Sequence, residues 1–154
     1  MQTITTYLSA ASPAAIWTDA FNDRLGEPPV LPYGGKALLA IRLFAKRVGS
    51  GRETLPLAEL SGVSAWSFSL KTELGGASLG SVIAEPGITV SGAADTDPVL
   101  TEIAIPLSLS GDALAAAIDG LDRLEATGEL AGTDAAGALV YLFRLPHIQI
   151  FNRL

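Results

Sequence analysis

Residues 138–154 read ALVYLFRLPHIQIFNRL, and this stretch indicates the fold class. Polar and apolar residues alternate near its end: the polar face carries His147 and Gln149, and the apolar face carries Ile148 and Ile150. Apolar residues at every second position are typical of a half-buried β-strand. Because Pro146 has no backbone N–H, we predict either two strands, over 138–145 and 147–153, or one long strand bent at the proline.

The same alternation recurs in three earlier stretches. KALLAIRLFAKRV predicts a strand over 36–47 whose inward residues are Leu39, Ile41 and Leu43. In VSAWSFSLKTEL, Trp66 and Phe68 alternate with small polar residues and are expected in the core. LTEIAIPLSLS alternates over 100–110, where Pro106 indicates a sheet edge or a bulge. Six to eight such short strands predict a mainly β fold, either an antiparallel β-sandwich or an open barrel.

Two segments instead show helical spacing. SPAAIWTDAFNDRLG begins with Ser12 and Pro13, which suit a helix start, and predicts a short helix over about 13–25. Its apolar stripe is Ile16, Trp17, Ala20, Phe21 and Leu25. SGDALAAAIDGLDRLEATG predicts a second short helix over about 111–125, with the stripe Leu114, Ala117, Ile118, Leu121 and Leu124. We therefore expect an N-terminal helical segment over 1–27 and a β-rich domain over 28–154, forming one compact domain.

Composition limits the class of protein. Of 154 residues, 49% are hydrophobic and 17% charged, a balance that excludes a disordered chain. The net charge of −6 and the single basic concentration at Lys46, Arg47 and Arg52 argue against a nucleic-acid partner. No apolar run approaches the roughly 18 residues that a membrane helix requires, so no membrane partner is expected. Without cysteine, disulfides and thiolate metal sites are excluded.

Residues that could carry chemistry do not form a recognisable motif. His147 is the only histidine, and no Gly-x-Ser-x-Gly turn accompanies it, so we interpret it as a structural residue on the wetter face of its strand. The acidic stretch Asp95–Asp97, with Glu102 beyond it, lacks the glycine and distal glutamate of a calcium loop. We predict no catalytic residue, no cofactor and no metal, and hence no enzyme.

The order of elements resembles the N-terminal attachment domains of phage tail-fibre and baseplate proteins. The resemblance covers about residues 28–154 and rests on LPYGG, KALLAIRLFAK, LPLAEL, VSAWSFSLKTEL and PHIQIFNRL in that order. It implies a sandwich that docks to a phage or prophage tail through interfaces and without a fixed site. It also implies synthesis in the bacterial cytoplasm and a final place in the virion tail.

The leading hypothesis is thus a non-enzymatic assembly module whose partners are other tail or baseplate proteins. Self-association into a homo-oligomer is also expected, because the charge content is low and a sheet edge is predicted near Pro106. The residues expected at the interface are Tyr33, Leu38 and Phe44, the last two of which point away from the assumed core. The alternatives are a carbohydrate- or ligand-binding β-sandwich with an exposed aromatic cleft, and a small enzyme with convergent polar groups.

Overall fold

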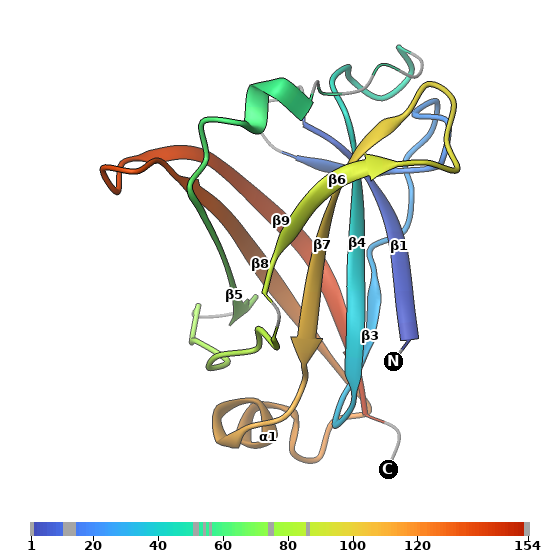
Figure 1. The fold of residues 1–154 in the computed structure, drawn as a ribbon. Helices are drawn as coiled ribbons and strands as arrows, with labels where there is room; N and C mark the ends of the chain where they lie inside the picture. The colour runs from blue at the N-terminus through green and yellow to red at the C-terminus, as the bar shows by residue number, and fades with distance from the viewer. Residues whose placement is uncertain are drawn as a thin grey trace.

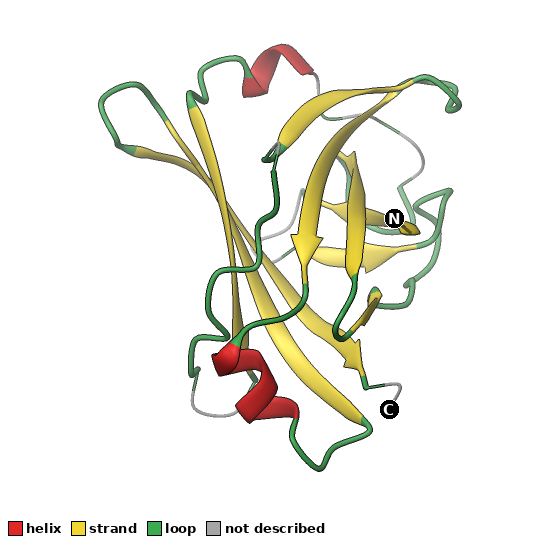
Figure 2. Ribbon diagram, turned by 60° about the horizontal axis from the view of Figure 1, so that its bottom comes forward, coloured by secondary structure: helices red, strands yellow, loops and turns green. Residues whose placement is uncertain are grey.

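The computed structural model describes residues 2–10, 15–50, 53, 55, 57–73, 76–85 and 87–152. Two β-sheets lie against each other (Figure 1). Within the described residues the helical elements are one α-helix, at one end of the molecule, and one 3-10 turn (Figure 2). The mainly β prediction is confirmed.

The first sheet has five strands in the order β2-β1-β4-β7-β6. Their bounds are β1 Gln2–Ser9, β2 Ile16–Thr18, β4 Lys36–Phe44, β6 Thr89–Ala93 and β7 Leu100–Ser108. β1 runs parallel to β4 along its whole length, from the pair Gln2 and Ala37 to the pair Ser9 and Phe44, whereas the other neighbours are antiparallel. The N-terminal residues are therefore part of the sheet.

The second sheet has four strands in the order β3-β9-β8-β5. Their bounds are β3 Val30–Pro32, β5 Ala65–Thr72, β8 Arg123–Thr133 and β9 Leu139–Phe151. β3 is parallel to β9, and the remaining pairs are antiparallel. The 3-10 turn η1 covers Leu57–Leu60 and the helix α1 covers Asp112–Ile118. The sheets are thus mixed, with antiparallel pairs predominating over the two parallel ones.

The core lies between the two sheets and is built from alternating side chains. The predicted inward residues of β4, Leu39, Ile41 and Leu43, have no exposed surface. They pack in one cluster with side chains of the opposite sheet, namely Phe68, Leu70, Leu130, Leu145, Ile148 and Ile150. Burying these apolar surfaces is the main favourable term in folding.

The predicted helix over 13–25 is wrong wherever the structure describes it, and residues 12–14 lie outside the described part. Ile16–Thr18 forms β2, which pairs with β1, and a turn follows. Within the turn the Asp19 carboxylate accepts hydrogen bonds from the N–H groups of Phe21 and Asp23. The apolar stripe does not act as one face, because Trp17 is buried whereas Phe21 and Leu25 are 62% and 74% exposed.

The second predicted helix exists but is shorter than 111–125. α1 ends at Ile118, and Gly120 follows with φ +75°, a left-handed conformation that ends a helix. Leu114 and Ile118 are buried as the stripe predicted. Leu124 is also buried, but as part of β8, because the chain returns to the second sheet at Arg123.

Pro106 lies on β7, which is an interior strand over much of its length. β4 pairs with β7 on one side, and β6 pairs on the other only as far as Ala104. Beyond that point the carbonyl of Pro106 accepts a hydrogen bond from the Ala84 N–H, so its nitrogen faces a loop and not a full strand. The proline therefore sits where the ladder does not need its missing N–H.

Candidate functional site

The three residues predicted at an interface do not form one exposed patch. Phe44 has no exposed surface, so the expectation that it points to solvent is wrong. β4 lies between two strands, and the ring of Tyr7 from β1 stacks over Phe44 with 6.1 Å between the ring centroids. Leu38 and Tyr33 are half-buried. An interface role for Leu38 and Tyr33 stays a prediction.

The first half of β9 instead presents an apolar edge. β3 pairs with β9 only over Gln149–Phe151, and among the described strands β8 alone pairs with residues 139–145. Leu139, Val140 and Leu142 are 59%, 44% and 43% exposed. Figure 1 shows the β8–β9 turn projecting beyond the neighbouring strands. We call Leu139–Leu145 the free edge of β9.

Trp66 lies at the rim of the core and not in its centre. It is half-buried, whereas Phe68 is buried as predicted. Leu60, Ser61, Val63 and Val90 line a groove of about 310 Å³ together with the Trp66 ring. The ring lies against Gly132 of the paired strand, where an added Cβ would come within 3.0 Å of it. The lining of the groove is therefore mostly apolar, and the Trp66 ring forms part of it.

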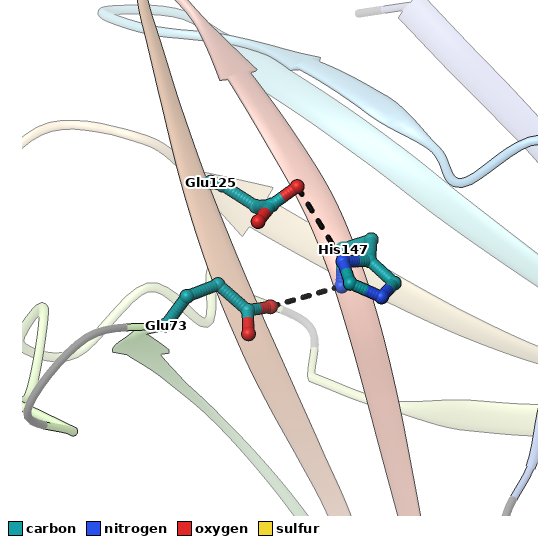
Figure 3. A group of neighbouring side chains, drawn as sticks. All are labelled: Glu73, Glu125 and His147. Atoms are coloured by element: carbon teal, nitrogen blue, oxygen red, sulfur yellow. Dashed lines mark hydrogen bonds and ion pairs between the residues drawn. The ribbon is translucent and has the colours of Figure 1, made fainter.

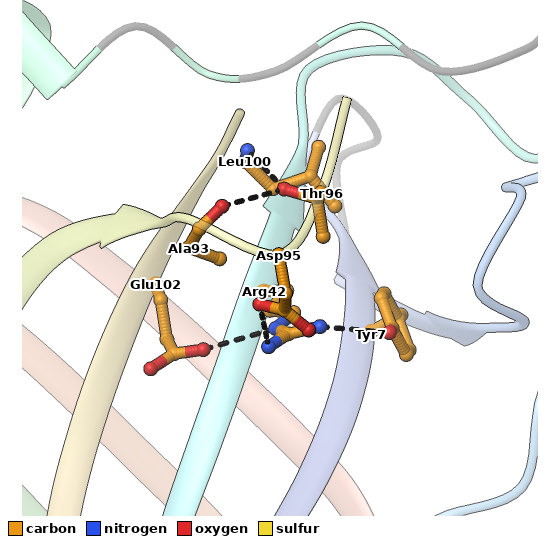
Figure 4. Close-up of polar contacts among 7 residues, drawn as sticks. All are labelled: Tyr7, Arg42, Ala93, Asp95, Thr96, Leu100 and Glu102. Atoms are coloured by element: carbon orange, nitrogen blue, oxygen red, sulfur yellow. Dashed lines mark hydrogen bonds and ion pairs between the residues drawn. The ribbon is translucent and has the colours of Figure 1, made fainter. Parts of the chain in front are cut away.

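A half-buried arginine connects three strands of the first sheet (Figure 4). The Arg42 guanidinium donates to Glu102 at 2.9 Å, to Asp95 at 2.7 Å and to the hydroxyl of Tyr7 at 3.1 Å. The hydrogen bond from Arg42 holds the pKa of Asp95 below its usual value. Asp95 and Glu102, the acidic residues that the sequence compares with a calcium loop, thus form ion pairs with Arg42. This network stabilises the sheet and offers no reactive group.

A bulge in β9 sets the position of His147. The register with β8 shifts between Ala126, which pairs with Ile148, and Gly128, which pairs with Leu145. β9 is therefore one long strand that is irregular at Pro146, one of the two arrangements predicted; Arg153 lies outside the described residues. His147 has φ +60°, a left-handed conformation that is uncommon for residues other than glycine. Such bulges redirect side chains, and here the imidazole is 61% exposed.

Two glutamates converge on this histidine (Figure 3). Glu125 on β8 places Oε1 3.4 Å from His147 Nδ1. Glu73, just after β5, accepts a hydrogen bond from the His147 N–H at 3.0 Å and one from the Thr127 hydroxyl at 2.7 Å. Burial raises the pKa of Glu73, but these hydrogen bonds outweigh it, and the pKa lies below the usual value. The group can therefore present two carboxylates and an imidazole to solvent.

This cluster was not foreseen from the sequence. The exposed position of His147 was predicted from alternation, and the structure confirms it. Glu125 and Glu73, however, are 22 and 74 residues away in the chain, and their approach depends on the β8–β9 and β5–β8 registers. No spacing signal in the sequence connects residues on β8, on β9 and just after β5.

A scan against models of protein families gives no match, and a search of curated proteins finds no similar sequence. Within the described residues, no helix has the length and apolarity to cross a membrane.

Proposed function

We propose that this chain is a non-enzymatic assembly module of a phage or prophage tail, and that the free edge of β9 is its assembly surface. The single observation that carries the proposal is the apolar first half of β9, which pairs with β8 on one side and with no described strand on the other. Exposed backbone N–H and C=O groups on an edge strand are a template for pairing with a strand of another chain. The placement in a tail rests on the resemblance of residues 28–154 to tail attachment domains.

The free edge carries little of the protection that usually prevents unwanted pairing. Edge strands are normally protected by charge, proline or short length. Between Leu139 and Leu145 the charged residue is Arg144, and three of the other side chains are exposed and hydrophobic. A strand from a second copy would pair with this backbone and cover Val140 and Leu142, which is strand addition to a sheet. The first partner to test is therefore a second copy of this chain.

The experiment compares the mass in solution of three proteins over a concentration series from micromolar to hundreds of micromolar. The proteins are the unmodified chain, Leu142→Lys at the free edge and Ala116→Lys on the exposed side of α1. We expect the unmodified chain and Ala116→Lys to self-associate and Leu142→Lys to stay monomeric, because a charge in the pairing surface must be desolvated.

A monomeric unmodified chain at every concentration would overturn self-association. Equal dissociation by both lysine variants would place the interface elsewhere. Either result would remove the free edge of β9 as a self-association surface.

The groove beside Trp66 favours a second candidate, a small-ligand-binding sandwich. Its volume of about 310 Å³ is at the lower end of ligand sites, and its lining is mostly apolar. Titration with an apolar dye or an oligosaccharide, followed by tryptophan fluorescence in the unmodified chain and in Trp66→Phe, tests it. A saturable response that Trp66→Phe abolishes would support ligand binding, and no response would remove this candidate.

A further inference from the structure

We infer that Glu73, Glu125 and His147 form a binding site for a divalent transition metal ion, with Zn²⁺ as the ion of best-matched chemistry. Each side chain offers one ligand atom, and the three atoms lie within 4.8 Å of one another. One imidazole nitrogen and two carboxylate oxygens are ligands that Zn²⁺ accepts, and three protein ligands leave a fourth position for water. The inference does not depend on the assembly surface at the free edge.

The distances are close to those a zinc site needs. Zn²⁺ bonds of about 2.0–2.2 Å in a tetrahedron put the ligand atoms about 3.4 Å apart. His147 Nδ1 and Glu125 Oε1 are 3.4 Å apart, so this pair already has the required spacing. Glu73 completes the set from the same side of the histidine as Glu125 (Figure 3), and rotation of its side chain closes the remaining distance.

Neighbouring groups hold the ligands in position. The Thr127 hydroxyl and the His147 N–H both bind Oε1 of Glu73, and within the described part of the chain no partner engages Oε2. The Gln149 amide donates to Glu125 Oε1 at 2.9 Å. Hydrogen bonds of this kind orient metal ligands and increase their affinity for the ion. The bulge orients His147 in a similar way, because the left-handed backbone of this residue directs its ring toward Glu125.

Charge also favours an ion at this place. The two carboxylates together carry a charge of −2, which a divalent cation neutralises, whereas without an ion they repel each other. Lys71 on β5, opposite Thr127, lies 3.7 Å from Glu129 and is thereby directed to that residue. Glu129 is thus a carboxylate on the same strand as Glu125 with a different partner.

The test uses the full chain without an affinity tag, titrated with Zn²⁺ in competition with a zinc-sensitive dye. His147 is the only histidine, so its two ring nitrogens give unambiguous signals in a long-range ¹H–¹⁵N NMR spectrum. We expect saturable binding of one ion and a shift of the Nδ1 signal. Glu125→Gln and His147→Asn should each weaken binding about tenfold or more, since losing even an outer partner of a ligand costs about 10–100-fold.

Two variants make the result specific. Asparagine tolerates the left-handed backbone at position 147, so His147→Asn should retain the fold, which circular dichroism checks. Glu129→Gln removes one carboxylate outside the cluster and should leave the affinity unchanged. The inference is overturned if millimolar Zn²⁺ does not shift the His147 ring signals. It is equally overturned if Glu129→Gln weakens binding as much as Glu125→Gln, which would indicate nonspecific attraction to an acidic protein.

Discussion

Replacing Trp17 by phenylalanine tests the strand assignment of β2 directly. The Trp17 ring is 4% exposed, and its Nε1–H donates to the carbonyl of Pro146 at 2.7 Å. This hydrogen bond joins residues 129 positions apart and connects β2 in the first sheet to the bulge of β9 in the second. The predicted helix over 13–25 does not account for this contact.

The expected loss follows from two terms. Leaving the Pro146 carbonyl without its donor costs about 1–3 kcal/mol. Removing part of a buried ring adds about 1–2 kcal/mol, below the range for complete deletion of a large aromatic side chain. We expect Trp17→Phe to reduce the free energy of unfolding by about 2–5 kcal/mol. In urea the unfolding midpoint should fall by about 1–2.5 M, at a slope of about 2 kcal/mol per molar.

The matched control is Leu25→Ala, at a residue that shares the helical stripe with Trp17 but is 74% exposed in the structure. We expect this change to alter stability by about 0.5 kcal/mol or less, as at other surface positions. Urea unfolding of both variants, followed by circular dichroism, gives the comparison. Comparable large losses in both would mean that Trp17 and Leu25 are buried on one face, and the reasoning for β2 would fail.

Three further outcomes are expected. Gly128→Ala should lower stability by about 1–3 kcal/mol in urea unfolding, because a Cβ would lie 2.8 Å from the Phe68 ring and 3.0 Å from Ile148. His147→Gly should raise the melting temperature, whereas His147→Val should lower it, since φ +60° suits glycine and strains a β-branched residue. Despite burial, hydrogen bonds hold the pKa of Glu73 below its usual value, so the stabilisation from its charged form is lost as the pH falls through the lowered pKa; Glu73→Gln should flatten the acid side of the stability–pH profile measured by urea unfolding.

Local pattern was sufficient for much of the β architecture. Alternation along 36–47 correctly assigned Leu39, Ile41 and Leu43 to the core, because the two-residue period of a strand is a local property that burial of one face makes visible. The same pattern failed for Phe44, which is buried on the other face. A central strand can be covered on both sides, and alternation along one strand does not reveal a ring that stacks on it from a neighbour.

In the N-terminal segment, helical spacing of apolar residues predicted a helix where the structure has a strand. Ile16, Trp17 and Phe21 have helical spacing, but pairing of β2 with β1 and the Trp17 hydrogen bond to Pro146 stabilise an extended chain instead. Tertiary contacts override a weak helical preference in so short a segment. The parallel pairing of β1 with β4 is likewise a tertiary contact, because it joins residues about 35 positions apart.

The sequence by itself determined the mainly β class, the inward faces of the central strands and the solvent-facing side of His147, because each depends on the order of residue types along a few neighbouring positions. The tertiary structure alone decided which strands pair, that the first half of β9 is a free edge, and that Glu73 and Glu125 lie beside His147. These features depend on register between distant segments, and a shift of one residue would turn each side chain to the opposite face of its sheet.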